Sequence, residues 1–238
     1  MNRLISGPRS FLLLTFLCAA LFLPGISSVP PTDRDEARFM QASKQMIESG
    51  DYISIRFQDE PRTKKPVGIH WLQVAAVKGI ARGNIEAVWA YRIPSVLAAW
   101  LSIIIVFVMG QRHCNRETGF LAATLTACSL GVVVEGHLAK TDATLLLTVI
   151  LTQFTLAEFY RTKDYRPPMI GWACAFWLSL GAGLLIKGPI ILGVVGVTVL
   201  ALATADRSIN WAMPLKPWLG IPITISVVLP WLMAANAI

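Results

Sequence analysis

Five ionisable side chains stand where polar stretches of this sequence meet apolar ones, which is where they could bind a polar ligand. They are Asp33, Asp35, Lys65, Asp142 and Lys187. A carboxylate can orient or deprotonate an attacking oxygen, and a lysine ammonium can neutralise a departing phosphate. The residue types therefore favour a ligand with a phosphate or another polar head group, held at the edge of an apolar region.

Each of these five residues also has a structural alternative. Asp33 can cap a helix, and an acid in the first turn, such as Asp35, is favourable for the helix dipole without any chemistry. Asp142 can likewise begin a helix, although an ionisable group at the point where a span enters the membrane is a functional candidate. Lys187 can extend its ammonium to the membrane surface, and Lys65 can bind anionic lipid head groups by charge attraction.

Four further charged residues lie next to these candidates. Glu36 and Arg38 share the first turn with Asp35, and we expect them to support a binding site or to form an ordinary solvated pair. For Arg62 and Lys64, attraction to anionic lipid is the better explanation.

The elements that must position these residues are apolar segments separated by short polar turns. The 238 residues are 55% hydrophobic and 15% charged, which is too little polar surface for a soluble globule. A removed leader followed by a soluble domain is excluded because the later segments are as apolar as the first. We predict an all-α polytopic membrane protein with about seven spans: Phe11–Val29, Arg92–Met109, Gly119–Val134, Thr141–Tyr160, Met169–Ile186, Pro189–Ala205 and Trp218–Ala235.

The charge distribution predicts the orientation of these spans. The net charge is +7, but the basic residues are dispersed among loops, so we expect no nucleic-acid partner. With the amino terminus in the cytoplasm, the two short outer turns carry only Lys140 and Lys187. The inner segments then carry Arg3, Arg9, Arg112, Arg116, Arg161, Lys163, Arg166, Arg207 and Lys216, as the positive-inside rule requires.

The segment from Pro30 to Tyr91 is predicted to be a long outer loop that contains two interfacial helices. The first is capped by Thr32 or Asp33 and runs to Glu48, with Gly50 as its terminator. The second starts with Pro66 at its first position and runs to about Ile80, too short for a span. The charged stretch between the two helices is where a polar head group could be held.

Several motifs in this loop and beyond it resemble one family of membrane enzymes. They are Thr32-Asp33-Arg34-Asp35-Glu36-Ala37-Arg38-Phe39, Ser49-Gly50-Asp51-Tyr52, Lys65-Pro66 followed by Trp71, Tyr91-Arg92-Ile93-Pro94-Ser95-Val96, His137-Leu138-Ala139-Lys140-Thr141-Asp142-Ala143 and Gly183-Leu184-Leu185-Ile186-Lys187-Gly188-Pro189. The chain resembles the amino-terminal half of the bacterial aminoarabinose transferases and their relatives, the protein O-mannosyltransferases. These are glycosyltransferases of the GT-C type.

The resemblance implies inverting transfer of a sugar from a polyprenyl-phosphate donor to a lipid A, glycolipid or protein acceptor. It implies that Asp35 is the base or the group that orients the acceptor, with Asp33 second. Lys65, Asp142, Lys187, Arg38 and Glu36 become substrate-binding candidates. The family has a glutamate where this chain has Lys64; a divalent metal remains a possibility, but the residues predict no metal ligands and no certain cofactor.

The resemblance also predicts how much of a family member this chain covers and in which membrane the protein lies. Members of the family are longer, so we expect residues 1–238 to form a single transmembrane glycosyltransferase domain that is truncated at the carboxy end, with residues 30–91 as its first periplasmic loop. The expected location is the bacterial inner membrane, with the active site facing the periplasm. Two other functions stay open from the residues alone, a secondary transporter or lipid flippase and a noncatalytic subunit.

Overall fold

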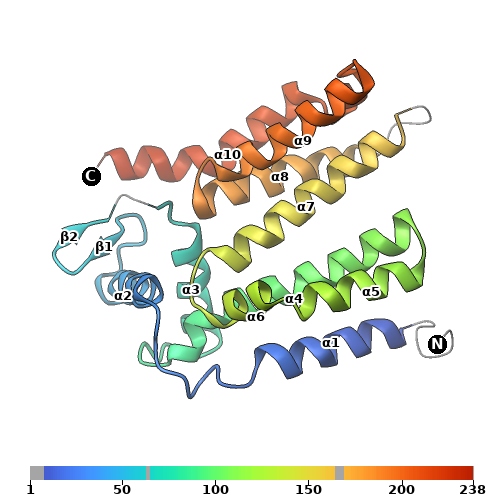
Figure 1. Ribbon diagram of the computed structural model, residues 1–238. Helices are drawn as coiled ribbons and strands as arrows, with labels where there is room; N and C mark the ends of the chain where they lie inside the picture. The colour runs from blue at the N-terminus through green and yellow to red at the C-terminus, as the bar shows by residue number, and fades with distance from the viewer. Residues whose placement is uncertain (1–7, 63–64, 164–168, 238) are drawn as a thin grey trace. The chain divides into compact units, whose positions relative to one another are not determined.

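The computed structural model describes residues 8–62, 65–163 and 169–237. Most of this chain is helical, as predicted, and Figure 1 shows long helices joined by turns. The backbone forms two compact units, the first of residues 8–62 and 69–147 and the second of residues 65–68 and 148–237. Helix α7 (Asp142–Arg161) begins in the first unit and continues in the second.

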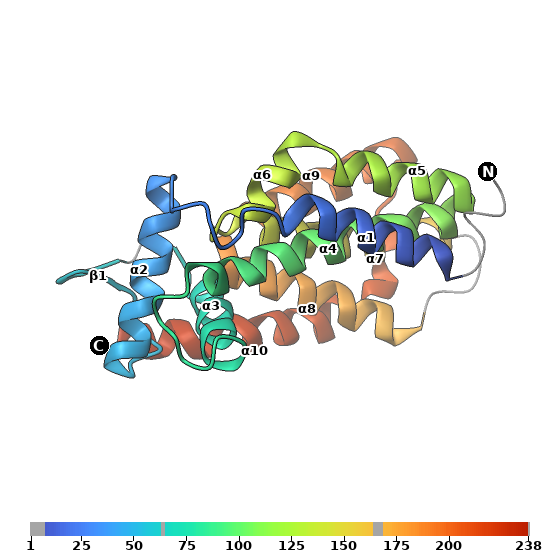
Figure 2. The same ribbon diagram turned by 90° about the horizontal axis from the view of Figure 1, so that it is seen from below.

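The first unit contains a layer of apolar helices. Its elements are α1 (Arg9–Phe22), α2 (Arg34–Ser49), β1 (Arg56–Phe57), β2 (Glu60–Pro61), α3 (Gly68–Gly79, of which Gly68 belongs to the second unit), α4 (Val88–His113), α5 (Arg116–Ala127) and α6 (Leu130–His137). Helix α4 packs along α5, and α1 lies against both (Figures 1 and 2). A Cβ built on Gly110 of α4 would lie 2.5 Å from the Cα of Gly119 in α5, so glycine is what allows this close approach.

The second unit is organised around α8 (Ile170–Lys187). This helix packs against α9 (Ile190–Asp206), against the short 3₁₀-helix η1 (Asn210–Leu215) and against α10 (Pro217–Asn236). The indole N–H of Trp177 donates to the carbonyl of Leu215 at 2.8 Å, and a methyl group at Gly220 would overlap the Trp177 ring. The fixed indole therefore joins α8 to the start of α10.

Within the described residues, fewer than seven helices meet the length and composition expected of a span. By length and composition, α4, α7, α8 and α10 can each cross a membrane, and α5 with α6 makes a fifth span if this bent pair is counted as one. Helices α1 and α9 have 14 and 17 residues and are shorter. Within the described residues, all seven predicted segments contain helix, but only four or five of them have the length of a span.

Two of the predicted apolar helices end early or break for identifiable reasons. Helix α1 ends at Phe22 rather than continuing to Val29, because Pro24 has no N–H to donate and Gly25 has a φ of 82°. The segment predicted as Gly119–Val134 bends by 58° between α5 and α6. There the hydroxyls of Thr124 and Thr126 bond to carbonyls four residues earlier, a pattern that bends helices.

The predicted outer loop contains both expected helices and one hairpin. Helix α2 ends within one residue of the prediction, at a Gly50 with a φ of 72°. Helix α3 starts at Gly68, two residues after the predicted Pro66. Strands β1 and β2 pair in antiparallel register, and β1 contacts α2. This hairpin was not predicted, because its turn at Gln58, with a φ of 58°, has no Asn-Gly or Asp-Gly signal.

Candidate active site

Asp33 is the N-cap of α2. Its Oδ1 accepts the backbone N–H groups of Asp35 at 2.7 Å and of Glu36 at 3.1 Å, and its Oδ2 lies 3.5 Å from the Nζ of Lys140. The bond from the Glu36 N–H, assisted by the Asp35 N–H and the Lys140 charge, holds the pKa of Asp33 below its usual value. The capping alternative is therefore what the structure shows for Asp33.

Asp35 lies in the same turn but does not serve as the cap, since Asp33 accepts both N–H groups there. Its carboxylate is paired with the Nη1 of Arg38 across 3.8 Å, and its side chain is 53% exposed. Arg38 also lies over the ring of Phe57, 5.9 Å from the centroid. Asp35 therefore presents a carboxylate to solvent at the N-terminus of α2, two residues after the capping Asp33.

Glu36 differs from the solvated residue that the sequence suggested. It is fully buried, and its Oε1 accepts the Nε–H of Arg92 at 2.8 Å and the N–H of Ala139 at 3.0 Å. Arg92, itself 2% exposed, also donates to the carbonyls of Ile26 and Val29 at 2.9 and 2.8 Å. The pair of Glu36 and Arg92 joins α2, α4 and the linker before α2, so Glu36 and Arg38 do not form the solvated pair that was the alternative to a supporting role.

Lys140 lies in the turn between α6 and α7, and Asp142 is the first residue of α7. Lys140 is 14% exposed and pairs with Glu135 at 3.2 Å as well as with Asp33. Burial lowers the pKa of Lys140, but the hydrogen bond to Glu135 and the charges of Glu135, Asp33 and Asp142 outweigh burial and raise it. Asp142 and Glu135 line a cavity of about 300 Å³, together with Ala99 and Ser129 among others.

Lys65 and Lys187 belong to the second unit. Gly68, just after Lys65, lies directly on the backbone carbonyl of Leu185, where a Cβ would approach to 2.6 Å. The segment that carries Lys65 is therefore a neighbour of the end of α8, where Lys187 lies before a Gly188 with a φ of 75°. The structure thus groups Asp33, Asp35 and Asp142 in one unit and these lysines in the other; that all five line one site stays a prediction.

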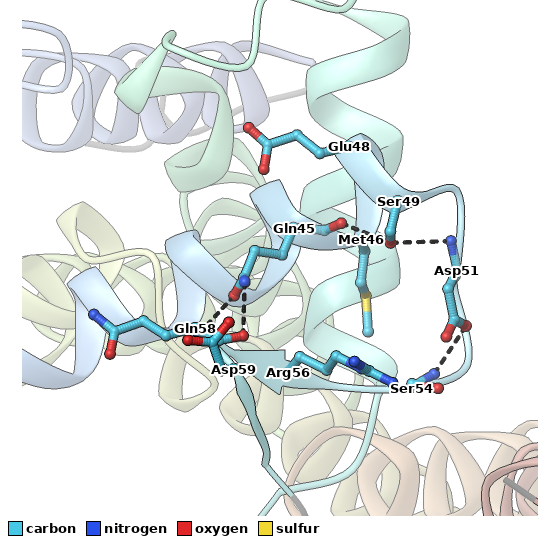
Figure 3. A pocket seen from close by; sticks show the side chains of 9 residues that line it. All are labelled: Gln45, Met46, Glu48, Ser49, Asp51, Ser54, Arg56, Gln58 and Asp59. Carbon is cyan, nitrogen blue, oxygen red and sulfur yellow. Dashed lines mark hydrogen bonds between the residues drawn. The ribbon is translucent and has the colours of Figure 1, made fainter.

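The charged stretch of the outer loop forms a separate polar pocket of about 650 Å³ at the C-terminal end of α2 (Figure 3). Gln45 of α2 holds the hairpin turn beside this pocket. Its Oε1 accepts the Gln58 N–H at 2.9 Å and its Nε2 donates to the Gln58 carbonyl at 3.0 Å. The ionisable residues that line it are Glu48, Asp51, Arg56 and Asp59. Arg62, beyond the hairpin, lies over the ring of Phe39, and Lys64 lies outside the described residues.

Comparison with known proteins identifies the family. The model of dolichyl-phosphate-mannose-protein mannosyltransferases matches residues 70–237. The chain belongs to this family. In the curated collection of proteins it is similar to an undecaprenyl phosphate-alpha-4-amino-4-deoxy-L-arabinose arabinosyl transferase of Pectobacterium atrosepticum, with 28% identity over 85% of this chain and 36% of the relative. A protein of the same name from Yersinia pestis is 26% identical over 98% of this chain and 41% of its own length.

Solved structures confirm the fold of this mannosyltransferase family member. ArnT from Cupriavidus metallidurans in the apo state superposes with a TM-score of 0.84 at 18% identity, over 95% of this chain and 41% of that protein. The structure of ArnT bound to undecaprenyl phosphate gives a TM-score of 0.80 at 19% identity, over 98% of this chain and 42% of that protein. The chain thus has the GT-C helical membrane fold and spans about two fifths of the length of these proteins.

Three features of the site were not found from the sequence. Arg92 was placed at the start of a span, whereas α4 begins at Val88 and Arg92 lies one turn inside it. A charged side chain inside an apolar helix needs a partner of opposite charge. The place of Arg92 within an apolar run was therefore a sequence signal for a buried carboxylate. The pairing of Glu135 with Lys140 and the buried contact of Ser43 with His70 had no local signal.

Among residues 8–62, 65–163 and 169–237, no three His, Cys, Asp or Glu side chains gather as metal ligands.

Proposed function

We propose that this protein is a membrane glycosyltransferase that moves a sugar from a polyprenyl-phosphate donor to an acceptor on the periplasmic side. Membership of the mannosyltransferase family and the GT-C fold support transfer from a lipid-linked sugar. The names of the relatives support an undecaprenyl phosphate carrier with 4-amino-4-deoxy-L-arabinose as the sugar. The acceptor is lipid A, another glycolipid or a protein.

The observation that carries this proposal is the difference between Asp33 and Asp35. Both were candidates for the base and both had capping as the alternative, but Asp33 alone accepts the N–H groups of the first turn. Asp35 keeps a half-exposed carboxylate whose paired cation is Arg38. A carboxylate that is not needed to cap the helix is available to an acceptor hydroxyl.

In the proposed reaction, Asp35 accepts the proton of the acceptor hydroxyl while the acceptor oxygen attacks the anomeric carbon. The bond between that carbon and the phosphate oxygen breaks, and its electron pair leaves with the polyprenyl phosphate. Lys65 and Lys187 are proposed to neutralise the phosphate, and Arg38 and Asp142 to hold the substrates. A single displacement of this kind inverts the anomeric centre.

We further propose that the protein lies in the bacterial inner membrane with its amino terminus in the cytoplasm. The basic residues of the inner segments support this orientation, and the longest charged loop then faces the periplasm together with Asp33 and Asp35. The site would there meet a polyprenyl-phosphate sugar in the outer leaflet of that membrane.

The test measures transfer of radiolabelled 4-amino-4-deoxy-L-arabinose from undecaprenyl phosphate into the lipid and protein fractions, in right-side-out and inverted vesicles that carry the complete gene product. Asp35→Asn is expected to lower the rate by about 10²- to 10⁴-fold, as loss of a general base does. Asp33→Asn, which keeps a capping oxygen, is expected to be milder.

The matched control is Asp59→Asn, which makes the same chemical change at the polar pocket. Equal tolerance of Asp35→Asn and Asp59→Asn would remove the catalytic role of Asp35. If only inverted vesicles transferred sugar to an externally added acceptor, the active site would face the cytoplasm and the proposed orientation would be wrong.

A further inference from the structure

The turn between α6 and α7 is held by side chains from three other helices. The N–H of Ala139 donates to Glu36 of α2 at 3.0 Å, and the carbonyl of Ala139 accepts the Nε2–H of Gln73 of α3 at 3.0 Å. The carbonyl of Lys140 accepts the hydroxyl of Ser95 of α4 at 3.4 Å. Three successive peptide groups are thus each bound by a different helix, so the conformation of the turn depends on tertiary contacts.

The contact from α3 is the end of a longer chain of buried hydrogen bonds. The hydroxyl of Ser43 donates to the Oε1 of Gln73 at 2.6 Å, and Ser43 lies 2.8 Å from the Nδ1 of His70. Because the Ser43 proton is directed to Gln73, the Nδ1 of His70 must carry the proton that it donates to Ser43. His70, Ser43 and Gln73 are all fully buried.

This chain of bonds fixes which way the Gln73 amide faces. Its oxygen is occupied by the Ser43 hydroxyl, so its NH₂ group is directed at the Ala139 carbonyl. In the opposite orientation, the amide oxygen of Gln73 would face the Ala139 carbonyl, which can only accept, so two acceptors would lie against each other. The network therefore specifies a single position for the peptide that precedes Lys140.

The residues that follow this peptide belong to the proposed site. Lys140 extends to Asp33 and Glu135, and Asp142 begins α7 at the wall of the 300 Å³ cavity. We propose that Gln73, with Ser43 and His70 behind it, is a positioning residue that holds the Lys140–Asp142 turn against the N-terminus of α2. The expected effect on turnover rests on the proposed function, whereas the claim that Gln73 holds the turn does not.

The test compares Gln73→Met, which keeps the volume of the side chain but cannot bond, with Gln153→Met. Gln153 donates to Thr198 at 3.0 Å in the second unit and makes a matched control for loss of a glutamine hydrogen bond in the helices. Amide hydrogen exchange by mass spectrometry is read on peptides that cover residues 138–142, in the complete protein purified in detergent. Sugar transfer and the midpoint of thermal unfolding are measured on the same samples.

Gln73→Met is expected to speed exchange in the 138–142 peptide about tenfold, with peptides of the second unit unchanged, and to lower turnover about 10- to 100-fold. Gln153→Met should leave the exchange of that peptide as in the wild type. If Gln73→Met fails to fold, Ser43→Ala is used, which frees the Gln73 amide while leaving its bond to Ala139 possible. It should give a smaller change in the same peptide.

The outcomes separate this inference from the proposed function. Unchanged exchange in the 138–142 peptide overturns the positioning role, whatever the activity. Faster exchange with undiminished transfer supports the structural role of Gln73 and overturns its catalytic consequence. Faster exchange in a protein whose wild type transfers no sugar supports the structural role and counts against the proposed function alone.

Discussion

The two ends of helix α2 are built from partners at very different separations along the chain. At the N-terminal end, Glu36 binds Arg92 and Ala139, which are 56 and 103 residues away. At the C-terminal end, Gln45 binds the backbone of Gln58, only 13 residues away. The first end is a buried junction of several helices, and the second is an open pocket formed by a helix and the hairpin that follows it.

This difference indicates which end is suited to chemistry. The proposed transfer of a sugar requires charged groups that keep their positions while bonds change, and long-range buried contacts supply that rigidity. The pocket at the other end is bounded by a hairpin that Gln45 holds from only 13 residues away, so we expect it to change shape without disturbing the more distant helices. We therefore expect substitutions at the N-terminal end to have large effects throughout the first unit, and substitutions at the C-terminal end to have small and local ones.

The largest effect is expected from Arg92→Met. This change leaves the Glu36 carboxylate buried without its cation, which typically costs about 3–5 kcal/mol of stability. The folded yield in membranes and the unfolding midpoint in detergent should both fall sharply. Arg38→Met, which removes an arginine from a half-exposed pair, should cost about 1 kcal/mol or less.

A double variant sharpens this test. When Glu36→Met is added to Arg92→Met, the uncompensated charge is removed and much of the lost stability should return. If Arg92→Met and Arg38→Met destabilised the protein equally, the N-terminal end of α2 would be no more dependent on its buried partners than an ordinary surface.

The parts of the site that could be predicted from sequence are those with local causes. Asp33 as N-cap and Gly50 as terminator of α2 follow from residue preferences within one turn of the helix ends. The membrane character of the chain follows from apolar runs. The shorter α1 could also have been anticipated, because Pro24 and Gly25 stand inside the segment predicted as one helix.

The parts that could not be predicted depend on contacts between segments far apart in sequence. Nothing near Glu36 distinguishes it from a solvated first-turn acid, and its burial follows only when Arg92 of α4 is placed beside it. The same holds for Gln73, whose partner is a backbone carbonyl 66 residues away. Such pairs have no periodic or compositional pattern, so one sequence does not reveal them.

A moderate effect is expected at His70 when the pH falls. Burial, and next the charge of Arg62, lower the pKa of His70 to about 3, so the folded protein keeps it neutral. The unfolded chain binds a proton near pH 6.5, so stability should fall as the pH drops from about 6.5 toward 3, by up to about 1.4 kcal/mol per unit. His70→Asn should have a flatter profile of unfolding midpoint against pH in this window, and identical slopes would contradict the assignment.

The smallest effect is expected from Gln45→Met at the other end of α2. The change removes both hydrogen bonds to Gln58 in a solvent-open position, which costs about 1 kcal/mol and opens the hairpin about fivefold more often. Tryptic cleavage after Arg56 and Arg62 should rise by that factor, while the unfolding midpoint stays close to the wild type.

Gln58→Gly is the matched control for the hairpin, because Gln45 binds only the backbone of residue 58. Glycine keeps both bonds and adopts the φ of 58° without the steric cost that a side chain incurs. Cleavage should therefore not rise in this variant. If Gln45→Met instead lowered the unfolding midpoint as much as Arg92→Met does, the C-terminal end of α2 would be as strongly coupled to the helices as its N-terminal end. The separation between a rigid site and a local pocket would then be lost.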